Sequence, residues 1–372
     1  MSNPTFERRT LGRPAQHKNE QQDLKSAVWM TLPAFLGLLF FIVLPFLLAV
    51  VFSFSNQRLM SPNPTEFVGL RNYDRLLSVR MIPIPAEKDS AGQIMLDENG
   101  QPTYPRTRTI LRAKPALEEF KELQTFNLFG GRYALIAKDA LFWMGMLNIL
   151  KFTLMVVPLQ CGVALLLAVL INQKLPGMTF FRTVFFSPVV TSMVVISIVW
   201  TFLYDRQVGL INQILSTVTF GHFTPIDWLG DPQVALLSIV IMSAWQGMGF
   251  QMVIFLAGLQ SISEELYEAA ELDGASTLQK FLFITWPGLR NTTRFVLTTT
   301  TIGALGLFTQ VDVMTQGGPN NSTLTVMMHA VRSGYQEQDI AYGSTISVVL
   351  FVMVLGIALV QRRLSMGGQK WA

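Results

Sequence analysis

The chain has 372 residues, of which 50% are hydrophobic and only 14% are charged, and it contains 27 phenylalanines. Soluble domains usually carry about 25% charged residues, so this composition excludes an ordinary soluble protein and indicates a membrane protein. The net charge of +4 is small and the basic residues are spread over loops and tails, so no nucleic-acid-binding surface is expected. The single cysteine, Cys161, and three scattered histidines exclude a disulfide framework and a Cys/His metal cluster.

The first hydrophobic run covers residues 29–54 and follows a polar, basic stretch. This run is too long for the core of a signal peptide, and no small-residue cleavage site follows it. We therefore expect residues 1–27 to be a cytoplasmic tail and residues 28–54 to be an uncleaved first membrane-spanning helix.

Residues 55–139 are polar and rich in turn-forming sequences such as SPNP, DENGQP and YPRT. They predict an extracytoplasmic segment with an insertion at about 78–137. Within it we expect a small hairpin at 89–100 and a short helix at 117–126.

Five more hydrophobic segments follow at 141–171, 180–204, 234–259, 294–313 and 341–360. Each holds roughly the twenty apolar residues that a bilayer core requires. The prediction is an all-α membrane protein with six spanning helices, five of them in a core at 140–361, and a cytoplasmic tail at 362–372. Lys and Arg concentrate in the termini and in the loops at 172–183 and 261–290, so both termini and these loops are expected to be cytoplasmic.

The loop at 261–287 is polar and predicts two short helices. Ser263 suits the N-cap of the first, and Gly274 can adopt the left-handed conformation that ends it. Ser276 and Gln279 form a capping-box pair for the second, and Pro287 ends it. Residue types alone leave two interpretations open, an ordinary loop packed on the bundle or a surface that receives a partner.

Six residues of this loop have the identities and spacing of the EAA loop of ABC importer permeases: Glu268, Ala269, Ala270, Gly274, Ile284 and Pro287. The family usually has Leu before this proline, where the chain has Trp286. The resemblance implies that the loop docks as a coupling helix on a cytoplasmic ATPase, with Glu268 as an electrostatic contact and the small residues giving a close fit.

Three other elements resemble sugar-type ABC permeases: FVGLRNY at 67–73, FFRTVFFSP at 180–188, and VDVMTQGGP at 311–319 with Ser322 and Thr323. The last is also similar to glycerol-3-phosphate permeases. The resemblance covers about 29–360 apart from the insertion. It implies a six-helix type I ABC importer transmembrane domain in a bacterial inner membrane. Its implied partners are a dimer of ABC ATPases, a second permease subunit, a solute-binding protein and membrane lipid.

The chemistry of an enzyme is not apparent in the sequence. No glycine-rich loop ending in Gly-Lys-Ser/Thr occurs, so ATP is expected to bind a partner chain. We expect no cofactor, no metal and no catalytic residues in this transport subunit.

Six residues in the fourth and fifth predicted spans are candidates for a carbohydrate pathway: Ser243, Trp245, Gln246, Gly247, Thr300 and Gln310. Polar groups combined with an aromatic surface suit a sugar. The alternative for each polar residue is a hydrogen bond between helices, which is how Ser, Thr and Gln commonly act in membranes.

The leading hypothesis is the permease subunit of an ATP-driven importer that moves a sugar or oligosaccharide by alternating access. One alternative is an importer of glycerol-3-phosphate or another polyol derivative, and another is an ATP-independent secondary transporter. A secondary transporter would more often show repeat symmetry and carboxylates within its spans, and neither is evident here. A membrane scaffold whose insertion binds a partner is the third alternative. The sequence does not identify the sugar.

Overall fold

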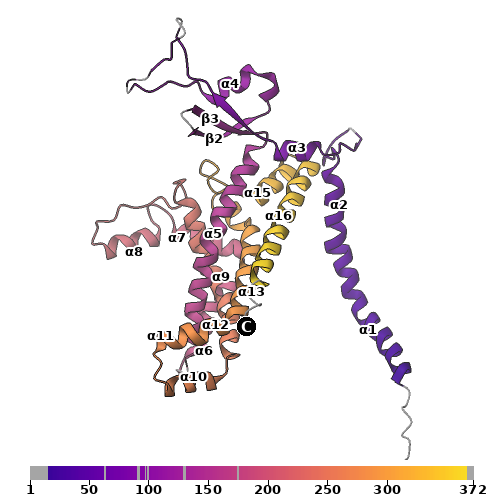
Figure 1. Cartoon of the computed structure of the whole chain (residues 1–372), viewed down its shortest axis with the longest axis vertical. Helices are drawn as coiled ribbons and strands as arrows, with labels where there is room; N and C mark the ends of the chain where they lie inside the picture. The colour runs from indigo at the N-terminus through magenta and orange to yellow at the C-terminus, as the bar shows by residue number, and fades with distance from the viewer. Residues whose placement is uncertain are drawn as a thin grey trace, which may run out of the picture. The chain divides into compact units, whose positions relative to one another are not determined.

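The computed structural model is mostly helical (Figure 1). It describes residues 16–62, 64–89, 93–96, 98, 100–128, 131–173 and 176–366. The chain divides into two units, residues 1–51 and 52–372, which are described separately. Parts of both predicted tails (1–15 and 367–372), of the 89–100 hairpin and of the 172–183 loop lie outside the described residues.

The first unit is helical where a first span was expected. It comprises α1 (Gln16–Leu38), a π-helical turn (Leu39–Val43) and most of α2 (Leu44–Ser53). Residues Lys25–Ser53 are long and apolar enough to cross a membrane. Within this unit large apolar side chains such as Phe41 are not covered, as is usual for a single apolar helix.

The segment after α2 folds around a small antiparallel sheet. It contains α3 (Arg71–Leu77), β1 (Val79–Ile84), α4 (Thr107–Ala113), a 3₁₀ turn (Pro115–Leu117), β2 (Lys121–Leu128) and β3 (Gly131–Ala137). The strand order is β1-β3-β2. Ile136 of β3 is buried in one hydrophobic cluster with Leu111 and Phe120.

The sheet corrects two predictions. The helix expected at 117–126 is wrong, because most of that stretch is β2, and the class is mostly helical but not all-α. Thr125 and Phe126 favour strands, and β3 supplies backbone hydrogen-bond partners that the local sequence does not reveal.

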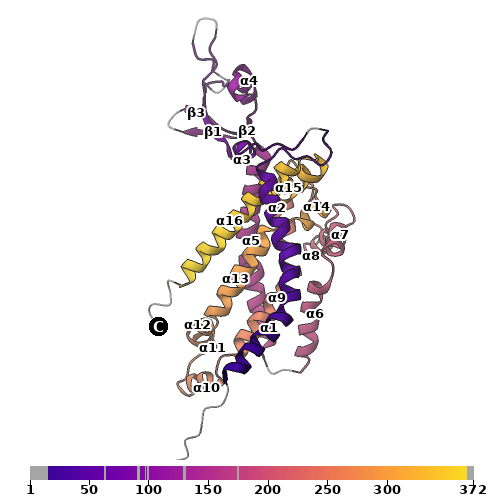
Figure 2. The same ribbon diagram turned by 90° about the vertical axis from the view of Figure 1, so that its right-hand side faces the viewer.

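Four long helices follow the sheet: α5 (Ala140–Ile171), α9 (Ala235–Gln260), α13 (Arg290–Leu305) and α16 (Ile340–Met366). Helices α5, α9 and α13 pack against one another, and both views show them side by side (Figure 2). Small residues permit the approach: Ala164 and Ala168 of α5 are fully buried in one cluster with Met252 and Phe255 of α9.

Two predicted spans are not single straight helices. The segment at 180–204 forms α6 (Met178–Val190) and α7 (Met193–Leu203), which meet at 100° because the backbone at Thr191 is extended. The segment at 294–313 is split into α13 and α14 (Thr309–Met314). Within the described residues, four helices are long and apolar enough to span, or five if the bent pair counts as one span. The prediction of six spans remains a prediction.

The remaining helices are short. They are α8 (Leu210–Val218), α10 (Glu264–Leu272), α11 (Thr277–Lys280), a π-helical turn (Phe281–Thr285), α12 (Trp286–Gly288), α15 (Val326–Val331) and a π-helical turn (Arg332–Gln336).

Candidate functional site

The loop between α9 and α13 forms the two short helices that its capping residues predict. Ser263 occupies the N-cap position of α10, although its side chain makes no capping hydrogen bond. The capping box of α11 is complete: the Ser276 Oγ accepts from the Gln279 amide at 3.3 Å, and the Gln279 Oε1 accepts from the Ser276 amide at 2.7 Å. The local sequence is therefore sufficient to start the second helix.

Gly274 ends α10 in the left-handed conformation, with a φ of +74°. The Ala275 amide donates to the Ala270 carbonyl at 2.9 Å, and the Gly274 amide donates to the Glu271 carbonyl at 3.0 Å. These two bonds define a Schellman motif, which requires a residue that tolerates positive φ. This motif ends α10 and redirects the chain into α11.

The loop presents its EAA-like residues on the surface. Glu268, Ala269, Gly274 and Pro287 are exposed, whereas Ala270 and Ile284 are partly buried. Large apolar neighbours are also uncovered, including Leu272 at 90% and Phe283 at 76% exposure. Their arrangement leaves an accessible, partly apolar face on a defined pair of helices.

Two side-chain contacts hold this helical pair together. The hydroxyls of Tyr267 and Thr285 share a hydrogen bond of 2.9 Å, and the Lys280 Nζ lies 2.6 Å from the Glu271 Oε1. The hydrogen bond from Lys280 lowers the pKa of the Glu271 carboxyl. These contacts link α10 to the residues after Gly274.

A cavity of about 330 Å³ with a mixed polar and apolar lining lies among α5, α7, α9, α13 and α14, and we call it the polar cavity for its uncharged polar side chains. Five of the six predicted pathway residues line it: Ser243, Gln246, Gly247, Thr300 and Gln310. Gln160 and Gln251 also line it. Among the described residues of the lining, none carries a charge.

Close packing fixes the amides of this cavity. The Gln251 Nε2 donates to the Thr300 Oγ1 at 3.1 Å, which joins α9 to α13. A Cβ added to Gly247 would lie 2.2 Å from the Gln160 Nε2, so a larger residue at this position would force that amide to move. The role of Gly247 in the cavity is therefore steric, because its lack of a side chain accommodates the Gln160 amide.

Two buried polar atoms of the cavity have no hydrogen-bond partner in the described part of the chain. They are the Ser243 Oγ and the Gln251 Oε1, on residues that are each only 7% exposed. An unpaired buried polar atom costs about 1–3 kcal/mol. Such atoms are normally satisfied by water or a ligand, and both belong to residues of the cavity lining.

The sixth candidate, Trp245, does not line this cavity. It faces an apolar groove of about 530 Å³ formed with α6 and α7, where its ring lies 5.5 Å from that of Trp200. The sequence analysis overlooked Gln160. It is one of two amide side chains, with Asn148, in the apolar run at 141–171, and that polarity within an apolar run was the available signal.

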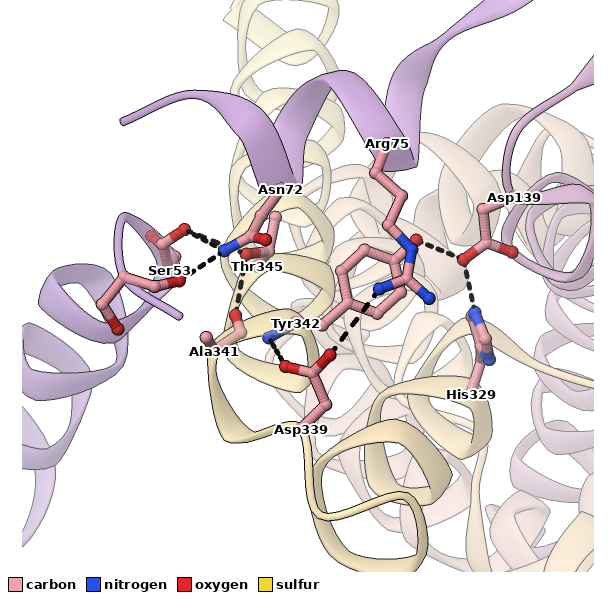
Figure 3. Close-up of polar contacts among 10 residues, drawn as sticks. Ser53, Asn72, Arg75, Asp139, His329, Asp339, Ala341, Tyr342 and Thr345 are labelled. Atoms are coloured by element: carbon pink, nitrogen blue, oxygen red, sulfur yellow. Dashed lines mark hydrogen bonds and ion pairs between the residues drawn. The ribbon is translucent and has the colours of Figure 1, made fainter. Parts of the chain in front are cut away.

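A second polar cluster joins α3, α5, α15 and α16, and the sequence analysis did not identify it (Figure 3). Asp139 accepts hydrogen bonds from the His329 Nε2 at 2.7 Å and from the Tyr342 hydroxyl. The Arg75 guanidinium lies 4.0 Å from the centre of the Tyr342 ring and 3.6 Å from Asp339.

Asp139 also caps α5, because its Oδ1 accepts from the Phe142 amide at 3.0 Å. Burial raises the pKa of the Asp139 carboxyl, but the hydrogen bonds from His329, Tyr342 and Phe142 outweigh burial and hold that pKa below its usual range. The cluster is thus a satisfied, buried charge network rather than an open site.

Residues 145–364 match the family described as binding-protein-dependent transport system inner membrane component. Two relatives illustrate the similarity. The arabinooligosaccharides transport system permease protein AraP of Bacillus subtilis is 34% identical over 60% of this chain and 72% of its own length. The lactose transport system permease protein LacF of Rhizobium radiobacter is 34% identical over 62% of this chain and 78% of its own.

A third relative is the trehalose/maltose transport system permease protein MalF of Thermococcus litoralis, 34% identical over 59% of this chain and 73% of its own length. A bacterial ABC transporter involved in the import of the acidic polysaccharide alginate has the same fold, with a TM-score of 0.62 at 17% identity. That match covers 94% of this chain and 98% of the alginate transporter chain. The chain therefore belongs to the binding-protein-dependent transport system inner membrane components and is a sugar-type ABC importer permease.

Proposed function

We propose that the chain is the membrane-spanning subunit of an ATP-driven importer that moves a neutral sugar or oligosaccharide inward across a bacterial cytoplasmic membrane. The observation that carries this proposal is the polar cavity between α5, α9 and α13. It contains two unpaired buried polar atoms, on Ser243 and Gln251, and no charged side chain among its described lining residues. Such a lining suits a ligand that offers many hydroxyl groups and no charge.

The uncharged lining weighs against the polyol phosphate alternative. A phosphate taken out of water requires a cation or several strong donors. The relatives named for arabinooligosaccharides, lactose and trehalose/maltose are named for neutral sugars, which also favours a neutral carbohydrate.

Coupling to ATP is proposed to occur through the exposed face of α10 and α11. On this proposal the Glu268 carboxylate contacts a separate ABC ATPase, while Ala269, Ala270 and Gly274 allow close approach. The loop and both termini lie in the cytoplasm, and residues 55–139 lie outside. Closure of the ATPase pair then moves the loop and switches the cavity from outward-open to inward-open.

One experiment separates the importer from a secondary transporter. The tagged chain is purified from its native membrane in mild detergent, co-purifying proteins are identified, and the eluate is placed in vesicles. We expect an ATPase and a second permease in the eluate, and uptake of a labelled neutral oligosaccharide that requires ATP. Uptake by the chain alone without ATP would establish the secondary transporter instead, and uptake of glycerol-3-phosphate in preference to oligosaccharides would establish the polyol importer.

The cavity itself is tested by Ser243→Ala. Removal of this hydroxyl should slow uptake while partner recovery stays normal. Ser347→Ala is the matched control, because the Ser347 hydroxyl bonds only the Gly343 carbonyl at 2.9 Å and lies outside the cavity lining. Equal effects of the two substitutions would argue against the cavity as the transport path.

A further inference from the structure

A second cavity, polar and larger than the first, lies between the sheet-containing segment and α3. Its volume is about 680 Å³. Five cations line it: Arg58, Arg71, Arg75, Lys121 and Lys138. We call this cavity the basic groove.

The carboxylates of the groove do not neutralise all of its cations. Asp74 and Glu119 both lie against Lys138, at 2.7 and 3.4 Å, and Asp339 lies 3.6 Å from Arg75. The hydrogen bond from Lys138 lowers the pKa of the Asp74 carboxyl, so this carboxylate stays charged as the partner of Lys138.

Three cations of the groove therefore remain free. The side chains of Arg58, Arg71 and Lys121 make no ion pair or hydrogen bond with any residue that the structure describes. All three are exposed. Exposed cations that share one cavity create a local positive potential and attract anionic groups.

Two residues of the groove lining, Asn72 and Arg75, are held by several contacts. The Asn72 Nδ2 donates to the carbonyls of Ser53 and Ser55 at 3.0 and 2.8 Å. Arg75 is held between the Tyr342 ring and Asp339, and Tyr342 in turn donates to Asp139 (Figure 3). A ligand in the groove would thus contact a surface connected to α5, α15 and α16, with little ordering required on binding.

The lining also limits the class of ligand. Guanidinium groups bind carboxylates with paired hydrogen bonds. Sugar-binding sites usually add aromatic faces, but no aromatic side chain occurs among the described residues of this lining. An acidic protein surface, which needs only cations opposite its carboxylates, fits the groove better than a carbohydrate does.

We infer that the basic groove is a docking surface for an acidic patch on a soluble protein outside the membrane. Under the proposed function, on which this inference rests, residues 55–139 lie outside and that protein is the solute-binding protein. The charges would speed the encounter and set its orientation. The docked protein would also contact Arg75, which connects α3 to Asp339 and to Tyr342 of α16.

The test uses the full chain in nanodiscs of phosphatidylcholine, which carries no net charge, and a fluorescent hexaglutamate peptide as the probe. We expect the wild-type protein to bind hexaglutamate but not hexaglutamine, and added salt to weaken binding. The variant Arg58→Gln/Arg71→Gln/Lys121→Gln should weaken hexaglutamate binding by about tenfold, as expected for the loss of three exposed ion pairs.

The matched control removes three other exposed cations of the same segment, by Arg108→Gln/Arg112→Gln/Lys114→Gln. These residues lie outside the groove lining, so the control should bind hexaglutamate like the wild type. Equal weakening by both triple variants would overturn the inference, because net charge alone would then explain binding.

A trisaccharide of galacturonic acid is tested beside the peptide. Tighter binding of that trisaccharide, lost in the groove variant, would also overturn the inference, because the groove would then be a site for acidic sugars. None of these measurements involves ATP or transport. Failure of peptide binding therefore leaves the proposed function intact, and failure of ATP-dependent uptake leaves the groove result intact.

Discussion

The substitution Gly274→Asp tests whether the α10–α11 loop docks on a partner, because its cost within the chain itself is small. Gly274 has a φ of +74°, and a Cβ added there would meet no other atom within 4 Å. The penalty is therefore confined to the backbone, about 1 kcal/mol for a side chain in the left-handed region and less for Asn or Asp. A penalty of this size leaves the loop folded.

We expect Gly274→Asp to melt close to the wild type but to lose the ATPase in a mild-detergent pull-down, because a charged side chain would occupy the contact surface. Gly221→Asp is the control. Gly221 has a φ of +82° and equally open surroundings, yet it follows α8, on the side proposed to be extracytoplasmic. Its substitution carries the same backbone cost and should leave ATPase recovery unchanged.

Normal ATPase recovery and normal uptake by Gly274→Asp would refute the docking model. Equal loss in both variants would show that backbone strain, rather than a lost contact, separates the subunits. Gly274→Asn then distinguishes shape from charge. It has nearly the size of aspartate without its charge, so loss of ATPase recovery in both variants indicates a steric contact.

Three further predictions concern separate parts of the chain. Gly247→Ala should slow uptake without loss of partners, because a Cβ 2.2 Å from the Gln160 Nε2 forces that amide to move and so reshapes the cavity lining; a wild-type uptake rate would contradict this. Because the pKa of Asp139 is lowered from 3.8, its contribution to stability is complete above pH 3.8 and is lost as the pH falls further. Melting temperatures should decline in that range less steeply in Asp139→Asn. Glu271→Gln should leave the melting temperature nearly unchanged, since the Glu271 side chain is 66% exposed, and a clear drop would reveal a structural role.

The long helices were predictable because each is a continuous apolar run. The runs at 141–171 and 234–259 nearly coincide with α5 and α9. Local chemistry was equally informative at Ser276, whose capping box requires only residues within one turn. Hydrophobicity does not indicate the direction of a helix axis, however. The 100° bend between α6 and α7 occurs within an apolar segment, where hydropathy remains high on both sides of Thr191.

Long-range contacts explain what the sequence could not reveal about the site. Asp139 and His329 are 190 positions apart, and no local pattern pairs them. Trp245 is adjacent to Gln246 in sequence, but a turn of 100° per residue directs the two side chains into different cavities. The rotation of α9 about its axis depends on packing against α5, which the sequence alone does not specify.

The open side of the polar cavity gives a physical reason for a second permease chain. Gln246 and Gly247 are only partly buried, and Thr299 and Gly303 are exposed, although all four line the cavity within the helical bundle. Lipid cannot satisfy exposed amides and hydroxyls, so polar groups at membrane depth must face protein or a water-filled path. A second permease that covers this side would complete the enclosure around a sugar. Under the proposed function we therefore expect this chain to provide one side of the pathway and a second permease to provide the other.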